Sequence, residues 1–238
     1  MVDIHSHIIY GVDDGPSTIS ESLSMIECAE RVGVTIIIAT PHIHELFFNI
    51  ERLTENYQEL LYKSREHKVS IKLGYEVLIC PQNDEEYDDL YFTLDGTRNI
   101  LFELPFNLLP QNGFEIIYNI RLKDRIPILA HPERNRNFLK SSNELNGYIN
   151  AGCLIQIDAA SIIGVYGRSV QSFVKKLICG NKVDFVASNA HCTRDYSEWY
   201  MAAYRMVAKW TGKENALRLF SCNAACIFPW EERIHAVL

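Results

Sequence analysis

The sequence has no long apolar run and no excess of basic residues. No segment approaches the ~20 apolar residues of a membrane-spanning helix, so we expect no direct insertion into a membrane. Lys and Arg total 23 against 30 Asp and Glu, and the resulting net charge of −7 argues against a nucleic-acid partner. The N-terminal residues MVDIHSHIIYGVDDG contain no basic leader and no cleavage site, so we expect no signal peptide and a cytoplasmic location.

Paired cysteines are missing as well. The chain has 7 cysteines, an odd number, and none of them forms a CxxC pair. A zinc ribbon is therefore not expected, and we interpret these residues as reduced, mostly packed thiols.

Short apolar runs alternate with helical patterns along the whole chain. This regular alternation is typical of successive βα units with parallel strands, and it predicts one α/β domain over residues 1–238. The predicted strands cover Val2–Ile8, Val34–Thr40, Val69–Glu76, Asn99–Leu104, Pro127–His131, Cys153–Ala159 and Asp184–Ala190.

Helices are predicted between these strands. Thr18 and Glu21 have the spacing of a capping box at the start of the first helix, and Gly33 supplies its stop. An acidic stretch over Cys80–Thr97 is predicted as a solvated loop or lid. The other helices are predicted at Ile50–Lys68, Gly113–Lys123, Ser141–Ala151, Arg168–Cys179, Glu198–Trp210 and Lys213–Phe220.

Histidines and acidic residues gather where the predicted strands end. His5 and His7 are two residues apart in the first strand, so their imidazoles share one face. In barrel-like α/β folds the carboxyl ends of the strands form the active face, so we expect these side chains to converge. The group comprises His5, His7, Asp13, Asp14, His42, Glu76, Glu103, His131, Asn189 and His191.

A single His or Glu beside a strand is more often an ordinary polar residue than a metal ligand, so the hypothesis depends on the joint pattern. Several of these residues follow apolar runs that should be buried, and a buried carboxylate without a cation is costly. Mixed imidazole and carboxylate ligands suit Mn, Fe or Zn, whereas the lack of Cys among them disfavours a structural zinc site.

Seven short motifs together resemble the polymerase-and-histidinol-phosphatase (PHP) superfamily. They read DIHSH, GVDDGP, IIATPH, GYEV, FELP, AHPER and SNAH in chain order. Within the superfamily the chain resembles the manganese-dependent protein-tyrosine phosphatases of bacterial capsule and exopolysaccharide operons, the CpsB/YwqE group. The resemblance implies a distorted (β/α)7 barrel, a trinuclear Mn²⁺ centre and hydrolysis of phosphotyrosine on an autophosphorylating bacterial tyrosine kinase.

The same resemblance implies a role for individual residues. One metal would be bound by His5, His7, Glu76 and Asn189, a second by Glu76, Glu103 and His131, and a third by Asp14, His42 and His191. Arg134 matches an arginine that contacts the substrate phosphate, and Arg194 is a candidate for a second such contact. Arg136 is a weaker candidate.

The chain departs from the family pattern at Asn189, where the motif expects Asp. An amide carbonyl can ligate a metal, but it carries no charge and accepts no proton, so metal binding or turnover would be weakened. We therefore expect Asn189→Asp to raise turnover at limiting metal. Two alternatives stay open: a phosphatase of histidinol-phosphate type, and a phosphotyrosine-binding regulator with weakened catalysis. The sequence also leaves a homo-oligomer open.

The predicted chemistry does not need a thiol. Paired cations can activate water and clamp the oxygens of a phosphate monoester. The CX5R loop of the cysteine-dependent phosphatases is absent, because no Cys of this chain is followed by Arg six residues later. Arg134 would supply a permanently charged, bidentate contact for phosphate oxygens.

Overall fold

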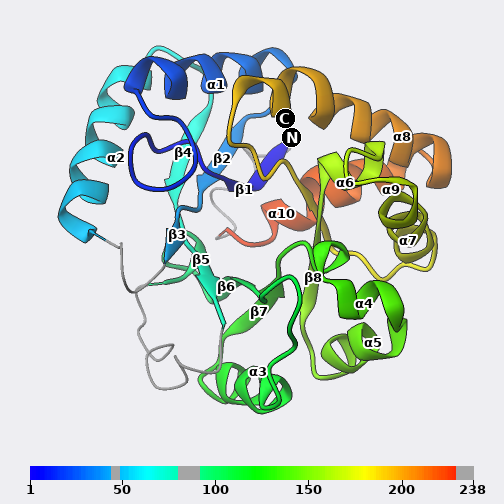
Figure 1. Ribbon diagram of the computed structural model, residues 1–238. Coiled ribbons are helices and arrows are strands. Elements are labelled where there is room, and N and C mark those ends of the chain that lie inside the picture. The colour runs from blue at the N-terminus through cyan, green and yellow to red at the C-terminus, as the bar shows by residue number, and fades with distance from the viewer. Residues whose placement is uncertain (44–48, 80–91, 229–238) are drawn as a thin grey trace.

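Short strands lie side by side at the centre of the molecule, and helices pack around them (Figure 1). The computed structural model describes residues 1–43, 49–79 and 92–228. The strands in these ranges are β1 (Val2–Ser6), β2 (Ile36–Ala39), β3 (His42–Ile43), β4 (Ser70–Leu73), β5 (Glu76–Leu78), β6 (Asn99–Glu103), β7 (Ile126–Leu129), β8 (Leu154–Asp158) and β9 (Phe185–Ala187).

The helices follow the strands along the chain and form the outer layer. They are α1 (Ile19–Arg31), α2 (Ile50–Ser64), α3 (Gly113–Leu122), α4 (Arg136–Lys140), α5 (Ser142–Asn150), α6 (Ala159–Ile163), α7 (Arg168–Cys179), α8 (Met201–Thr211), α9 (Lys213–Leu217) and α10 (Asn223–Ala225). None of the helices in this part of the chain combines the length and apolarity needed to cross a bilayer.

All the strand pairs are parallel. One sheet has the order β1-β2-β4 and the other has the order β3-β5-β6-β7-β8-β9. β2 and β3 are two halves of one interrupted strand, and β4 and β5 are two halves of the next. Counted in this way, the seven predicted strands are confirmed, with their ends shifted by a few residues.

The ring closes between the first strand and the last. Ser6 forms an isolated parallel bridge with Ala190. Beside it, the His7 amide donates to the Ala190 carbonyl at 2.8 Å, and the Asn189 amide donates to the His5 carbonyl at 2.9 Å. These bonds complete the circuit β1-β2/β3-β4/β5-β6-β7-β8-β9, so the predicted distorted (β/α)7 barrel is confirmed.

The interruptions in the ring have local causes. Pro41 lies between β2 and β3 and offers no amide hydrogen to a ladder. Gly74 lies between β4 and β5, where an added Cβ would meet Leu94 at 2.7 Å and Ile38 at 2.8 Å. Only glycine allows that close approach of the chain. As a result β5 starts anew at Glu76 and carries this carboxylate into the ring.

Two apolar clusters hold the layers together. A smaller cluster fills the inside of the ring and includes Ile4, Ile38 and Ile128 from three different strands. A larger cluster joins the outer strand faces to the helices, with Ile26, Phe138 and Val174 among its fully buried members. The polar strand ends lie beyond the inner cluster, on a rim that apolar side chains make rigid.

Most predicted helices are confirmed. α1 has the complete capping box between Thr18 and Glu21, and α7 has the predicted bounds. α2 ends at Ser64, four residues before the predicted Lys68. The predicted helix Glu198–Trp210 begins instead with a π-helical turn at Asp195–Tyr200. Of the predicted acidic loop, residues 80–91 lie outside the described ranges.

Candidate metal centre

Each interrupted or complete strand delivers a polar side chain to one rim of the barrel. His5 lies in β1 and His7 directly after it, while Glu76 begins β5 and Glu103 ends β6. The pairing of β1 with β2 is irregular between Asp3 and Ser6, and such irregularities re-aim side chains beside active sites. The rim also carries His42, His131, Asn189 and His191. The residues that we expected to converge therefore lie together in the structure.

Glu76 is the centre of the cluster. Its side chain is fully buried, and its Oε2 atom lies 3.1 Å from His5 Nε2 and 3.0 Å from His42 Nδ1. The same oxygen lies 3.4 Å from His7 Nε2, and Oε1 lies 2.7 Å from His131 Nε2. Burial disfavours its charge, but His5 and the hydrogen bonds from neighbouring imidazoles hold the pKa of Glu76 well below its usual range.

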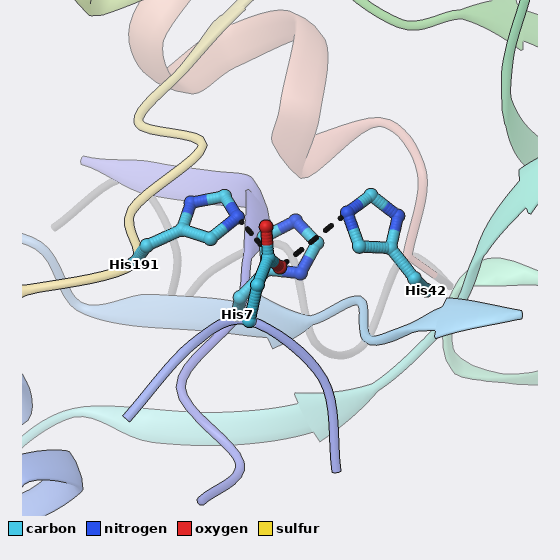
Figure 2. A group of neighbouring side chains, drawn as sticks. His7, His42 and His191 are labelled. Carbon is cyan, nitrogen blue, oxygen red and sulfur yellow. Dashed lines mark ion pairs between the residues drawn. The ribbon is translucent and has the colours of Figure 1, made fainter. Parts of the chain in front are cut away.

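A second carboxylate faces His42 and His191 from the loop after β1. Asp14 Oδ1 lies 3.2 Å from His191 Nε2 and 3.6 Å from His42 Nε2, and Figure 2 shows these ion pairs beside His7. The rings of His7 and His191 stack with their centroids 4.1 Å apart. The hydrogen bond with His191 lowers the pKa of Asp14. This loop therefore adds a charged oxygen to nitrogens from three separate segments.

The ligand atoms fall into three overlapping groups. In each group every atom lies within 4.8 Å of the others; the groups are His7, Asp14, His42 and His191; His5, Glu76 and His131; and His42, Glu76 and Glu103. The third predicted metal site, with Asp14, His42 and His191, corresponds to the first of these groups. The other two predicted sites share Glu76, and so do the second and third groups. Their other members differ, because the second group combines His131 with His5 and the third combines Glu103 with His42.

The donor set fits divalent cations. Glu76 Oε2 and Asn189 Oδ1 are buried and accept no well-aligned hydrogen bond from the described residues. Burial and the nearby Glu76 raise the pKa of Glu103. A buried amide oxygen without a hydrogen-bond donor and two carboxylates that repel each other both indicate a cation nearby, and the mixture of imidazole and carboxylate suits Mn, Fe or Zn.

Two residues outside the predicted ligand set orient the histidines. Asp13 Oδ2 lies 2.7 Å from His7 Nδ1 and also accepts from the His42 amide at 3.2 Å. Gln156 Oε1 lies 2.9 Å from His5 Nδ1. In both histidines the outer nitrogen is thus engaged and Nε2 faces the cluster, which is the arrangement that metal-binding imidazoles need.

Asp158 is a buried carboxylate that the sequence analysis did not select. It ends β8, accepts from Gln156 Nε2 at 3.0 Å and from Asn189 Nδ2 at 3.1 Å, and lies 3.7 Å from the Arg134 guanidinium. Burial disfavours its charge, but His131 and Arg134 keep the pKa of Asp158 below its ordinary value. The rule that selected the other residues, a polar side chain at a strand's carboxyl end, applies equally to Asp158.

An open cavity of 660 Å³ lies above the cluster. Arg134 reaches it from a 3₁₀ turn at Pro132–Arg134, and its guanidinium lies 4.6 Å from the Phe106 ring centroid and 4.9 Å from that of Tyr166. Arg194 lines another part of the cavity, with its guanidinium 4.7 Å from the Trp199 ring centroid. The cavity thus combines two cations with three aromatic rings. The exposed Arg136 is not among its lining residues.

Two strand ends carry strained backbone. His131 has φ 31° and Asn189 has φ 48°, both in the left-handed region that residues other than glycine seldom adopt. Such strain concentrates at functional sites, where the surrounding structure enforces it. His131 and Asn189 are both in the predicted ligand set, so the unusual backbone lies where the proposed chemistry is.

Comparisons with known proteins identify the family of this chain. The family model for capsular polysaccharide synthesis, CpsB/CapC, matches residues 1–229. CapC of Staphylococcus aureus is 36% identical over 196 residues, which cover 80% of this chain and 77% of CapC. The tyrosine-protein phosphatase YwqE of Bacillus subtilis is 31% identical over 219 residues, 90% of this chain and 86% of YwqE.

A solved structure is similar over the whole chain. It comes from a study of YwqE from Bacillus subtilis and CpsB from Streptococcus pneumoniae, described there as metal-dependent tyrosine phosphatases. It superposes with a TM-score of 0.85 at 28% identity and covers 100% of this chain and 94% of its own. With the family model matching nearly from end to end, the chain belongs to the CpsB/CapC family of capsular polysaccharide synthesis proteins.

Proposed function

We propose that this protein removes phosphate from phosphotyrosine on an autophosphorylating bacterial tyrosine kinase, with Mn²⁺ as its metal. The protein is a metal-dependent phosphoric monoester hydrolase of the tyrosine-protein phosphatase class, in a family of capsule synthesis. The identity of the metal, the kinase partner and the cytoplasmic location are the finer parts of the proposal. So are a single domain over residues 1–238 and the roles of individual residues.

One observation carries the proposal. Five histidines and three carboxylates lie together beneath a cavity whose wall holds Arg134 between two aromatic rings. A cluster of cations and a fixed guanidinium can together neutralise the oxygens of a phosphate monoester, and aromatic walls suit the ring of a phenolate leaving group.

The imidazole and carboxylate groups would hold the cations. When bound, the cations supply an activated water and neutralise the charge of the phosphoryl oxygens. Asp13 holds the His7 ring and Gln156 holds the His5 ring, each through the nitrogen that faces away from the cluster. The protein's own contribution is therefore a set of ligands that hydrogen bonds already hold in the orientation that metal binding needs.

Arg134 would bind the phosphoryl group. Its guanidinium is positioned by Asp158 at 3.7 Å and by the faces of Phe106 and Tyr166. An arginine held in place in this way keeps its charge at every relevant pH and loses little entropy when it grips two oxygens. Arg194 beside Trp199 would supply a second, more exposed contact at the cavity wall.

The test is a comparison of substrates on the metal-loaded protein. We expect release of phosphate from a phosphotyrosyl peptide and from the autophosphorylated kinase, and little release from histidinol phosphate or a phosphoseryl peptide. Tight binding of the phosphotyrosyl peptide without turnover would instead support the regulator alternative. The family and its named relatives favour a tyrosine phosphatase over both the histidinol-phosphate phosphatase and the regulator.

A matched control separates metal from thiol chemistry. Cys192 is the one cysteine among the described residues that line the cavity, so it is the candidate for a thiol nucleophile there. We expect chelation to abolish phosphate release and added Mn²⁺ to restore it, while Cys192→Ser and thiol alkylation leave most of the activity. Activity that survives chelation but is lost with the thiol would refute the proposal.

A further inference from the structure

Asn189 is held in one orientation by its neighbour Asp158. Its Nδ2 atom donates to Asp158 Oδ2 at 3.1 Å. A carboxylate only accepts, so the atom facing it must be the amide nitrogen, and the carbonyl oxygen faces the other way. That oxygen is buried and accepts no well-aligned hydrogen bond from the described residues. The side chain therefore presents a buried oxygen without a hydrogen-bond donor among these residues just after β9, where the Asn189 backbone amide donates to the His5 carbonyl.

Asp158 has contacts on both sides of the site. One oxygen accepts from Asn189 and lies 3.7 Å from Arg134, and the other accepts from Gln156 at 3.0 Å. Gln156 in turn holds the His5 ring at 2.9 Å. The Asp158 side chain is fully buried, so its charge depends on these polar neighbours. One carboxylate thus connects the phosphate-binding arginine with two candidate metal ligands.

We propose that Asp158 and Asn189 together replace the single carboxylate that the SNAH motif lacks. Asn189 supplies the ligand oxygen, and Asp158 supplies the negative charge and fixes the amide so that this oxygen faces the metal. Asp158 is accordingly a positioning residue for the first metal site. This inference rests on the proposed metal centre, and it makes the chain's departure from the family motif a paired exchange rather than a loss.

The contact changes what Asn189→Asp should do. The substitution would remove the donated hydrogen bond and place two carboxylates against each other in a buried site, which costs free energy through like-charge repulsion. The expectation from the sequence, a gain in turnover at limiting metal, is therefore replaced. The double variant Asp158→Asn/Asn189→Asp keeps one carboxylate and one amide with their positions exchanged. The new amide at position 158 can donate a hydrogen bond to the new carboxylate at position 189.

The experiment measures Mn²⁺ binding without substrate. Titration calorimetry and metal analysis after dialysis are applied to the wild type, to Asp158→Asn, to Asn189→Asp and to the double variant. We expect each single variant to lose roughly 10- to 100-fold in affinity at one site, the range for partners that orient metal ligands. We expect the double variant to recover to within about threefold of the wild type, because the pair is restored in reverse.

Asp184→Asn is the matched control. Asp184 also accepts a hydrogen bond through its carboxylate, from the Ile155 amide at 2.8 Å, but at the opposite end of β8. It should leave the Mn²⁺ affinity unchanged even where it lowers the thermal midpoint. If Asp158→Asn does not fold, Asn189→Asp and the double variant carry the comparison: weaker binding in the single variant supports the pair.

The inference is overturned if Asp158→Asn binds Mn²⁺ like the wild type. It is equally overturned if the double variant binds no better than Asn189→Asp. Failure of the proposed function would look different, since a wild type that binds Mn²⁺ but hydrolyses no phosphotyrosyl peptide would leave the binding comparison intact.

Discussion

Arg134 is the residue whose replacement should separate substrate binding from metal binding. We expect Arg134→Ala to keep its metal content and to lose about 1.5–3 kcal/mol of phosphate-ester binding, the range for a hydrogen bond to a charged group. The loss corresponds to roughly a ten- to hundredfold rise in the dissociation constant for inorganic phosphate, which calorimetry measures.

Arg136→Ala is the control for this change, since Arg136 is exposed and does not line the cavity. The control should bind phosphate like the wild type. Equal phosphate binding by Arg134→Ala and the wild type would remove Arg134 from the proposed mechanism.

Asp13 should matter for metal binding although it is not in the predicted ligand set. Asp13→Asn replaces the acceptor of the His7 Nδ1 hydrogen with a neutral amide that can turn its nitrogen toward the ring. We expect roughly a 10- to 100-fold loss of Mn²⁺ affinity with the fold retained. Metal analysis beside Asp124→Asn, which changes an exposed aspartate, makes the comparison; equal metal content in the two variants would contradict the prediction.

At the scale of the elements, the break between β4 and β5 positions Glu76. We expect Gly74→Ala to destabilise the protein by about 1–3 kcal/mol, the usual range for overpacking, because the new methyl group meets Leu94 and Ile38 below normal contact distance. We also expect weaker Mn²⁺ binding, because the start of β5 must shift. Thermal melts with and without Mn²⁺ measure both effects, and a variant as stable and as metal-competent as the wild type would show that the chain tolerates the methyl group.

The elements also show how far the sequence could predict the site. His5, Glu76, Glu103 and His131 were predictable because an apolar run followed by one polar side chain marks the carboxyl end of a buried parallel strand. Pro41 marks the break after β2 in the sequence, but nothing local shows that a strand resumes at His42. The break before β5 comes from the tertiary contact at Gly74, which the sequence does not show. The π-helical turn at Asp195–Tyr200 has no sequence signal of its own.

The roles of Asp13, Gln156 and Asp158 were not predicted, although Asp13 was placed among the converging residues. Their roles lie in what they contact, His7, His5 and Asn189, and a contact across 151 residues between His5 and Gln156 leaves no local pattern. Of the two residues that were left out, Gln156 and Asp158, only Asp158 had a usable signal, its position at the end of a predicted strand. The orientation of a ligand is thus less visible in the sequence than the ligand itself.

At the scale of the whole molecule, the metal centre gathers ionisable side chains for which protons and metal cations compete. Burial disfavours the charged form of His7, but Asp13 and Glu76 outweigh it and raise its pKa to about 10. Burial also disfavours the charged form of His131, but the nearby Asp158 and Glu76 outweigh it and raise the pKa of His131 to about 9. In the metal-free protein these imidazoles hold protons at neutral pH.

The stability of the metal-free protein should therefore fall as the pH rises. Below the ordinary imidazole pKa of about 6.5, both histidines are protonated in the folded and the unfolded chain, and their stabilisation is complete. It is lost as the pH passes through about 9 and about 10. Because cations displace these protons, the gain in thermal midpoint from a fixed Mn²⁺ concentration should grow from pH 6 to pH 8.5.

Thermal melts of chelated and Mn²⁺-loaded protein across this range test the prediction. The chelated protein serves as the control for pH effects outside the site. A metal-free midpoint that rises with pH, together with a constant gain from Mn²⁺, would contradict it.

The seam between β1 and β9 has a consequence for biosynthesis. Its bonds join His5 and His7 to Asn189 and Ala190, segments separated by more than 180 positions along the chain. Contacts of such long range form late, because the loop between them must first be ordered. A ribosome exposes the first two histidines long before His191, so a cation captured early would be held by an incomplete ligand set. We therefore expect the full centre to load only once the ring has closed, after the last strand has left the ribosome.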